Sequence, residues 1–138
     1  MQKLLFSTSE IAKDLALAML RIGTALMMLT HGWAKISDFT GYLAKFSDPI
    51  GLGPAVSLQL AIFAEFFCAI LLALGFLTRL SLIPMMFTML VAGLIAHAGD
   101  PFSSKEKALL FLLVFVVLFL LGPGKYSVDA HIRENRKY

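Results

Sequence analysis

Five ionisable residues interrupt the apolar segments of this chain: Arg21, His31, Lys35, Glu65 and His97. A charged side chain inside a membrane is costly, so such residues usually face the protein interior, pair with one another and belong to functional sites. A carboxylate with imidazole and cationic neighbours could hold a polar ligand group and relay protons. We therefore predict that these five residues form a polar, ligand-binding cluster.

The spacing of small residues indicates which way these side chains point. In "AIFAEFFCAILLALGFLTRL", the small residues Ala61, Ala69 and Ala73 fall at four-residue steps that include Glu65. Small residues let membrane helices approach closely, so Glu65 is expected on a packed face. A second stripe with three- and four-residue steps comprises Ala18, Arg21, Ala25, Met28, Gly32 and Lys35. We expect each ionisable group to point inward.

Depth along the helices adds a second constraint. At about 1.5 Å per residue, His31, Lys35 and His97 lie near the outer ends of their helices, and Glu65 lies between the levels of His31 and Arg21. The groups are expected to converge in the outer half of the protein. Either Arg21 or His31 is then the partner of Glu65, and the sequence leaves the choice between them open. Lys35, taken alone, is interpreted as a lysine whose long side chain reaches the membrane interface. His97 is equally consistent with membership of the cluster and with a merely polar residue at the end of its helix.

The elements that would carry these residues are membrane spans. The chain has 138 residues, of which 59% are hydrophobic and 15% charged, and its mean hydropathy is +0.82. Soluble domains are less apolar and more highly charged. We predict an all-α fold, a single integral membrane domain over 1–138 that forms a four-helix transmembrane bundle. Its spans are approximately 11–35, 56–78, 80–98 and 104–121, since about 17–25 apolar residues cross a bilayer.

Several local signals refine these spans. Ser7 with Glu10, and Ser103 with Glu106, have the spacing of a capping box at a helix start. Pro84 is expected near the first turn of the third helix, where its missing N–H matters least. The N-terminus lacks the pattern of a cleaved signal peptide. The basic tail, 125–138, is expected to lie at the anionic inner membrane surface.

Basic residues indicate the orientation of the spans. One side would carry Lys3, Lys13, Arg79, Lys125, Arg133, Arg136 and Lys137, and the other Lys35, Lys45, Lys105 and Lys107. The positive-inside rule then predicts that both termini are cytoplasmic. Because the basic residues are spread over loops and tail, we predict no nucleic-acid partner.

The residue inventory excludes several chemistries. Cys68 is the single cysteine, so one chain contains neither a disulfide nor a CxxC redox pair. The sequence has no glycine-rich phosphate loop, nucleophile elbow or metal-ligand spacing such as HExxH. We therefore expect no metal and predict that the chain does not carry electrons or catalyse a reaction alone.

Four motifs in order resemble the DoxX family of small four-helix bacterial membrane proteins. They are "HGWAK" from His31, Glu65 in the second span, "LGFLTR" from Leu74, and "GPGKYSVD" from Gly122, which follows the last span. The resemblance covers about Leu15 to Asp129 and implies a multi-pass protein of the bacterial cytoplasmic (inner) membrane. It also implies a context of quinone-coupled redox or sulfur metabolism, as in the membrane subunit of thiosulfate:quinone oxidoreductase. The family's polar positions fall on His31, Lys35 and Glu65, without an implied catalytic role.

Alternative functions remain open at this point. The first is a membrane subunit or accessory of a quinone-linked oxidoreductase, with quinone as its ligand and soluble redox enzymes as partners. The second is a non-enzymatic membrane scaffold in the lipid bilayer, where buried polar groups only hold helices together. A small proton-coupled transporter would need a wider pathway and hence a homo-oligomer. A haem between His31 and His97 is the last alternative, because both histidines would lie at similar depth.

Overall fold

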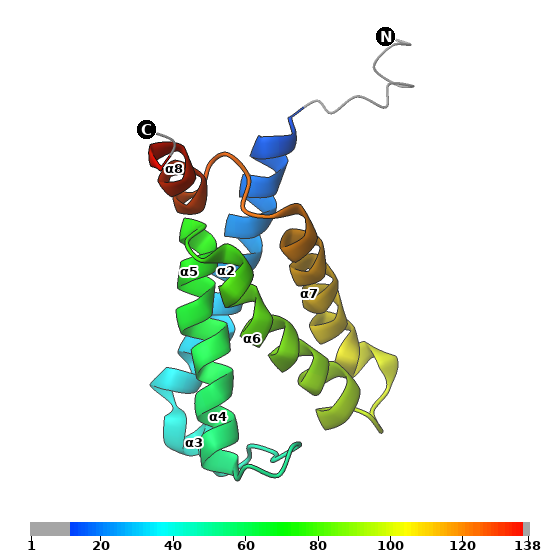
Figure 1. Cartoon of the computed structure of the whole chain (residues 1–138). Helices are drawn as coiled ribbons and strands as arrows, with labels where there is room; N and C mark the ends of the chain where they lie inside the picture. The colour runs from blue at the N-terminus through cyan, green and yellow to red at the C-terminus, as the bar shows by residue number, and fades with distance from the viewer. Residues whose placement is uncertain (1–11, 137–138) are drawn as a thin grey trace.

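The computed structural model describes residues 12–136, which form helices joined by loops, with no strand within that range (Figure 1). The helices in chain order are α2 (Lys13–Ser37), α3 (Phe39–Leu43), α4 (Pro54–Ile62), η1 (Phe63–Phe67), α5 (Cys68–Leu74), α6 (Thr78–Leu90), η2 (Val91–Ala96), α7 (Phe102–Leu121) and α8 (Val128–Asn135). The elements η1 and η2 are π-helical turns. The predicted all-α class is confirmed for the described residues.

Three helical segments are long and apolar enough to cross a membrane: Lys13–Ser37, Pro54–Leu74 and Thr78–Ala96. They correspond to the first three predicted spans. The fourth segment, α7, has 20 residues, but Lys105, Glu106 and Lys107 occupy its first turns. Its uncharged part, from Ala108 to Leu121, is about 21 Å long at about 1.5 Å per residue, shorter than a bilayer core of about 30 Å.

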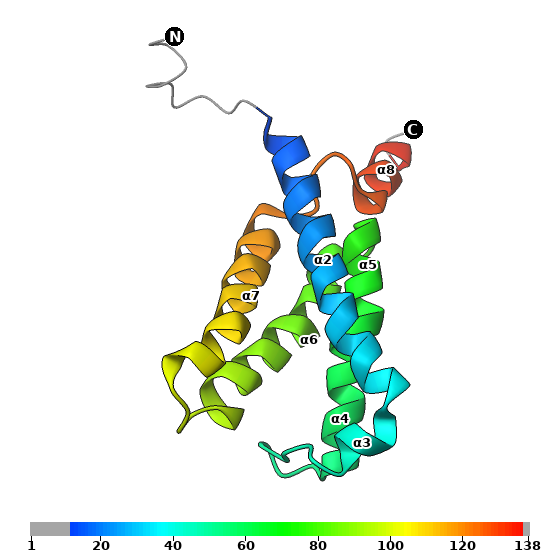
Figure 2. The same cartoon turned by 180° about the vertical axis from the view of Figure 1, so that it is seen from behind.

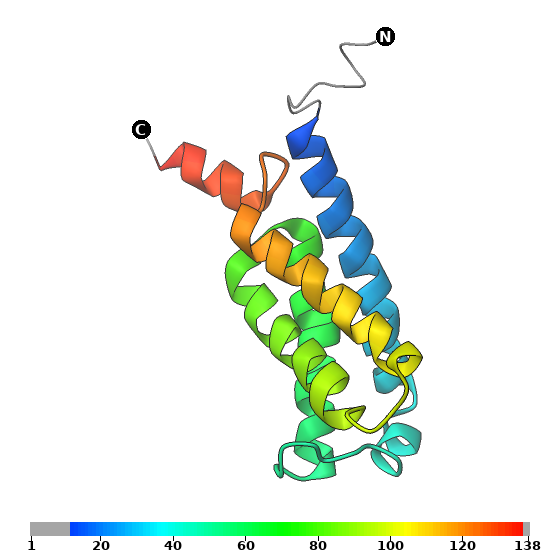
Figure 3. The same cartoon turned by 90° about the vertical axis from the view of Figure 1, so that its right-hand side faces the viewer.

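The chain reverses direction between helices, so the described helices share two ends. In Figures 1 and 3, the start of α2, the α5–α6 turn and α8 lie at one end, here called the α8 end. The segment with α3, the loop 44–53 and the η2–α7 connection lie at the other, here called the α3 end. Figure 2 shows α2 between α5 and α7, and both helices contact it.

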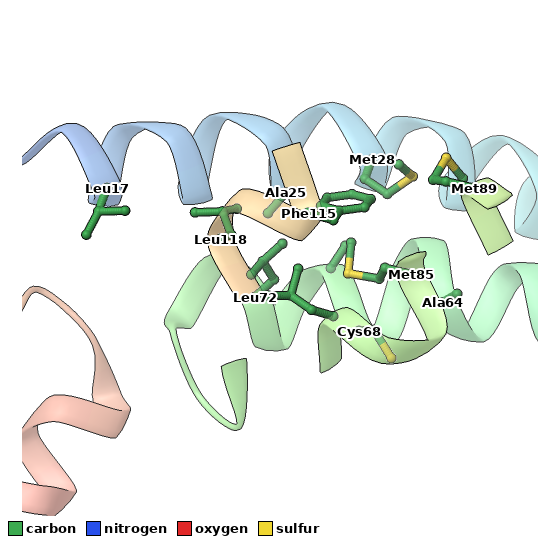
Figure 4. Packing of buried hydrophobic residues seen from close by; sticks show 12 residues of the cluster. Leu17, Ala25, Met28, Ala64, Cys68, Leu72, Met85, Met89, Phe115 and Leu118 are labelled. Atoms are coloured by element: carbon green, nitrogen blue, oxygen red, sulfur yellow. The ribbon is translucent and has the colours of Figure 1, made fainter. Parts of the chain in front are cut away.

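Small residues and methionines fill the space between the helices. The core cluster includes Ala25, Met28, Ala64, Cys68, Leu72, Met85 and Phe115, whose side chains point toward one another from α2, η1, α5, α6 and α7 (Figure 4). The predicted packed stripes are confirmed, because Ala61, Glu65 and Ala69 are buried while Phe63 and Phe67 are exposed. Small inward residues and large outward ones suit helices that pack closely in lipid.

Helix α2 approaches its neighbour closely at Gly32. A Cβ atom at this position would come within 2.8 Å of the backbone of Glu65 and Phe66. Only glycine therefore allows α2 to lie against η1 at this distance. The contact brings the last turn of α2 face to face with the π-helical turn that carries Glu65.

Three local predictions need correction. Proline 101 precedes α7 without a side-chain cap, so Ser103 and Glu106 do not form a capping box, and Ser7 with Glu10 lies outside the described residues. Because α6 begins at Thr78, Pro84 lies inside the helix and removes one internal hydrogen bond. The second helix ends at Leu74, where Gly75 takes a left-handed conformation with φ of 67°.

The C-terminal segment is helical rather than a plain tail. Ser127 caps α8 by accepting a hydrogen bond from the N–H of Ala130, and the N–H of Asp129 donates to the carbonyl of Gly75. The Asp129 carboxylate accepts from the N–H groups of Leu77 and Thr78 at 2.8 and 2.9 Å. A carboxylate at a helix start satisfies free N–H groups. The C-terminal helix α8 is thereby attached to the start of α6.

Candidate functional site

Glu65 pairs with Lys35 at the α3 end. The Lys35 Nζ atom lies 2.5 Å from Glu65 Oε2, and the two side chains are 13% and 7% exposed. Lys35 is therefore paired with a residue of the neighbouring helix, whereas its position alone favoured a lysine that extends away from the protein. The ammonium also lies 5.8 Å from the centre of the Tyr42 ring in α3, within the range of a cation–π contact.

The pair joins two elements that the sequence positions for it. Lys35 lies about one turn beyond Gly32, where α2 approaches η1, and Glu65 is at the centre of the π-helical turn. A π-helical turn widens the helix and is frequent at functional sites. The local backbone thus turns the carboxylate toward the lysine of the neighbouring helix.

His31 lies beside this pair. Its ring meets Phe111 of α7 edge-on, with ring centres 6.1 Å apart and planes at 88°. It is half-buried and interacts electrostatically with Glu65, Lys35 and Lys107. The predicted neighbourhood of His31 and Glu65 is therefore present, although the direct partner of Glu65 is Lys35.

A pocket of about 470 Å³ opens next to the ion pair, and Lys35, Glu65 and His97 all line it. Its other walls are mainly apolar and come from the loop 46–50, from α4 and η1 with Leu60 and Phe63, and from α6 and η2 with Phe87 and Val91. A concave apolar site with a few polar groups is the usual form of a small-molecule site. The structure thus unites three of the five predicted residues around one cavity.

His97 follows η2 at the wall of this pocket but does not point inward as predicted. Its Nδ1 atom lies 2.7 Å from Asp100 Oδ2, and its side chain is 46% exposed. His31 instead contacts Phe111, and it does not line the pocket. The two histidines therefore do not face one another across a shared site, and they do not fit a bis-histidine haem.

Arg21 belongs to the opposite end of the molecule. Its Nη1 and Nη2 atoms donate to the carbonyl oxygens of Pro123 and Tyr126, each at 2.6 Å, and the residue is 2% exposed. On the same helix, Arg21 and Lys35 are separated by about 21 Å at about 1.5 Å per residue. The predicted convergence of Arg21 with Glu65 is wrong, because the arginine holds the loop between α7 and α8.

The wall formed by residues 46–50 depends on Asp48, which the sequence interpretation did not single out. Its carboxylate accepts hydrogen bonds from the N–H groups of Leu52 and Gly53 and from the Ser57 hydroxyl. The bond from Gly53, assisted by those from Ser57 and Leu52, lowers the pKa of Asp48. A local pattern in "SDPIGLGP" could have predicted this ordered loop: an aspartate followed by two glycines. In the structure both glycines, Gly51 and Gly53, have positive φ.

Chemically, the site combines an ammonium donor, a carboxylate and an imidazole with apolar walls. The ammonium can donate to a ligand carbonyl, while carboxylate and imidazole can accept and release protons. This arrangement suits a mainly apolar ligand with one polar, protonatable end. The charges that such a ligand meets are already paired, so its binding leaves no isolated buried charge.

Comparisons with known proteins agree with a membrane protein. The DoxX family model matches residues 16–98. The chain is 32% identical to "Inner membrane protein YqjF" of Escherichia coli (strain K12), over 85% of this chain and 92% of that protein. It is 28% identical to "Inner membrane protein YphA" of the same organism, over 86% and 91% respectively. No solved structure matches the chain.

The family match extends from α2 to the end of the third long helical segment, and so includes Lys35, Glu65 and the pocket walls on α4 and α6. The two relatives are similar over almost their whole lengths. With three helical segments of membrane-crossing length and composition, this chain is a membrane protein that belongs to the DoxX family.

Proposed function

We propose that this protein is the membrane component of a quinone-linked oxidoreductase and that the pocket beside Lys35 and Glu65 receives the quinone ring. The proposal rests on one observation, the mainly apolar pocket of about 470 Å³ with an ion pair in its wall. A quinone requires an apolar slot, a donor for a carbonyl oxygen and a route for protons. The pocket residues are of the types that meet these three needs.

Each polar residue has a distinct role in this proposal. A bound quinone supplies the acceptor for two electrons and two protons. The Lys35 ammonium holds a carbonyl oxygen, and the Glu65 carboxylate accepts and passes on a proton. His97, exposed and paired with Asp100 at the pocket wall, exchanges protons with water. Because the chain has a single cysteine and no cofactor-binding motif, the electrons come from a soluble redox enzyme.

Replacing Glu65 by glutamine is expected to weaken quinone binding by at least about tenfold, which corresponds to about 1.4 kcal/mol. The amide keeps the size and the hydrogen bond to Lys35 but removes the charge that orients the ammonium. The measurement is the Kd of a short-chain ubiquinone analogue for detergent-purified protein. Glu106→Gln is the matched control, because Glu106 is an exposed carboxylate outside the pocket.

A second variant tests the pocket without altering the ion pair. Ala92→Leu adds bulk to the pocket wall on η2 and should also reduce quinone binding. Helical circular dichroism and a single elution peak confirm that each variant is folded. Unchanged binding in both Glu65→Gln and Ala92→Leu, or no binding by the original protein, would refute the proposal.

We further propose that α7 is a fourth span and that both termini are cytoplasmic, in the bacterial inner membrane as for the two relatives. Besides the buried Arg21, the described part of the α8 end carries five basic residues, Lys13, Arg79, Lys125, Arg133 and Arg136, and the α3 end carries four, Lys35, Lys45, Lys105 and Lys107. This distribution supports the α8 end as the cytoplasmic one. The short apolar part of α7 can be accommodated by local thinning of the bilayer and by extended flanking lysines.

Cysteine labelling of intact cells tests this topology. Gly99 has open space around its Cβ position, and Tyr126 is 60% exposed. A membrane-impermeant maleimide should label Gly99→Cys in intact cells and Tyr126→Cys only after permeabilisation. The buried Cys68 provides the background in both cases. Equal labelling of both positions in intact cells would exclude the fourth span.

A non-enzymatic scaffold is the second candidate function, favoured by the close contact at Gly32. In that case the Lys35–Glu65 pair only fastens α2 to η1, and partner binding occurs elsewhere. Isolation of the intact protein from membranes separates the candidates. Co-purifying soluble redox enzymes support the oxidoreductase subunit, whereas unrelated partners support the scaffold.

A further inference from the structure

A second hollow, of about 620 Å³, lies at the α8 end and has no part in the proposed quinone site. It is lined by the start of α6, the end of α7, the following loop and α8. Its apolar lining includes the exposed side chains of Leu77, Leu80 and Leu121. Six charged residues also line it: Asp14, Arg79, Lys125, Asp129, Arg133 and Glu134. The hollow is therefore amphipathic and lies at the start of α6, the helix that opens the third segment of membrane-crossing length.

Hydrogen bonds hold the frame of this hollow. Asp129 caps the start of α6, the Asp14 carboxylate accepts from the Lys125 N–H at 3.1 Å, and Arg79 Nε donates to the Phe119 carbonyl at 3.2 Å. Within the part of the chain that the structure describes, no hydrogen bond or ion pair engages the side chains of Arg133 and Glu134. The Lys125 ammonium likewise has no such partner among the described residues, since only its backbone N–H is engaged. Two cations and one carboxylate thus remain available to a ligand.

A buried donor adds a separate observation. Thr78 lines the hollow and is 1% exposed, yet its hydroxyl has no hydrogen-bond partner among the described residues. A buried hydroxyl without a partner is costly, and native proteins rarely leave one unsatisfied. An acceptor oxygen from a bound molecule would satisfy it.

The charges indicate what kind of molecule this is. Three cations and three carboxylates line the hollow, so their formal sum is zero. A simple anion would gain little net attraction, whereas a group carrying both signs matches the wall. A primary ammonium can donate N–H bonds to a carboxylate, but a trimethylated one cannot.

We propose that this hollow binds the headgroup of an aminophospholipid. The phosphodiester lies toward Arg79, Arg133 and the Thr78 hydroxyl, and the primary ammonium lies toward Glu134. The acyl chains begin over Leu77, Leu80 and Leu121, which a free zwitterion would leave exposed. The bound lipid would attach α8 to the membrane surface.

Competition between lipids in native mass spectrometry tests this site. The purified protein is mixed with equal amounts of phosphatidylethanolamine, phosphatidylcholine and phosphatidylglycerol. Phosphatidylethanolamine is expected to be retained about tenfold over phosphatidylcholine, the ratio for one charge-assisted hydrogen bond of about 1.4 kcal/mol. Inorganic phosphate at millimolar concentration should not displace it, because phosphate lacks both the ammonium and the acyl chains.

Two charge-neutralising variants sharpen the test. Arg133→Gln should reduce retention of phosphatidylethanolamine, whereas Glu134→Gln should shift the preference toward phosphatidylglycerol by making the wall net positive. Both residues are exposed, and their side chains make no hydrogen bond or ion pair with the described residues, so folding should be unaffected. Lys107→Gln, a cation at the α3 end, is the control, and quinone binding should remain unchanged in Arg133→Gln.

Three outcomes would overturn the assignment. Equal retention of phosphatidylethanolamine and phosphatidylcholine would exclude recognition of the primary ammonium. Displacement by phosphate would make the site an anion site rather than a lipid site. An unchanged lipid preference in Glu134→Gln and Arg133→Gln would place the bound lipid elsewhere on the protein.

Discussion

Replacing Lys35 by methionine is expected to destabilise the protein by about 3 kcal/mol, because it leaves the Glu65 carboxylate without its cation. The loss is at the lower end of the range for buried pairs, since the two side chains retain 13% and 7% exposure. The measurement is the free energy of unfolding in detergent micelles. Lys45→Met, in the exposed loop beyond α3, is the matched control and should change stability little.

The double variant Lys35→Met with Glu65→Met distinguishes the charge from the packing. Apolar side chains of similar volume often replace a buried ion pair at little cost. We therefore expect the double variant to regain most of the stability lost in the single one. In a double-mutant cycle on the free energy of unfolding, this corresponds to a large coupling energy between Lys35 and Glu65. A single variant as stable as the original protein would show that the pair is solvated rather than buried.

Replacing Arg21 by methionine should release the connection between α7 and α8. The two hydrogen bonds to Pro123 and Tyr126 come from a charged donor, and each such bond contributes about 1.5–3 kcal/mol. We expect a loss of about 3 kcal/mol in the free energy of unfolding, together with faster amide exchange over residues 122–135. Hydrogen–deuterium exchange measured by mass spectrometry reports both effects by segment.

Matched variants locate this effect. Arg21→Lys should give an intermediate result, because one ammonium does not reproduce the fork of two guanidinium donors. Arg136→Gln, an exposed cation beyond α8, should leave exchange unchanged. Quinone binding at the α3 end should persist in Arg21→Met, since about 21 Å of helix separates the two sites. Slow exchange over 122–135 in Arg21→Met would contradict the assigned role of the arginine.

Residue spacing predicted the faces of the first two long helices. Glycine, alanine and methionine at three- and four-residue steps mark the side that packs, and the structure buries Ala25, Met28, Ala61 and Ala69. The first three spans were also predictable, because a long apolar run with few charges has few alternatives to a membrane helix. The cap of α8 at Ser127 and the loop ordered by Asp48 also have recognisable local signals, a serine before a helix and an aspartate before two glycines.

Partners between helices could not be predicted in the same way. Periodicity shows which side of a helix packs, but not which residue of another helix reaches it at the same level. Lys35 pairs with Glu65 because Gly32 lets α2 lie against η1 and because a π-helical turn reorients the carboxylate. Neither feature is visible in the alanine spacing.

Arg21 shows the same limit at the α8 end. Its place on the packed stripe was evident from spacing, yet its partners are backbone carbonyls more than 100 positions further along the chain. The sequence by itself thus determined the first three spans and the inward faces of the first two, since both follow from local hydrophobicity and side-chain size. The tertiary structure alone decided which inward charges meet, because that depends on helix contact distances and on the path of the loop between α7 and α8.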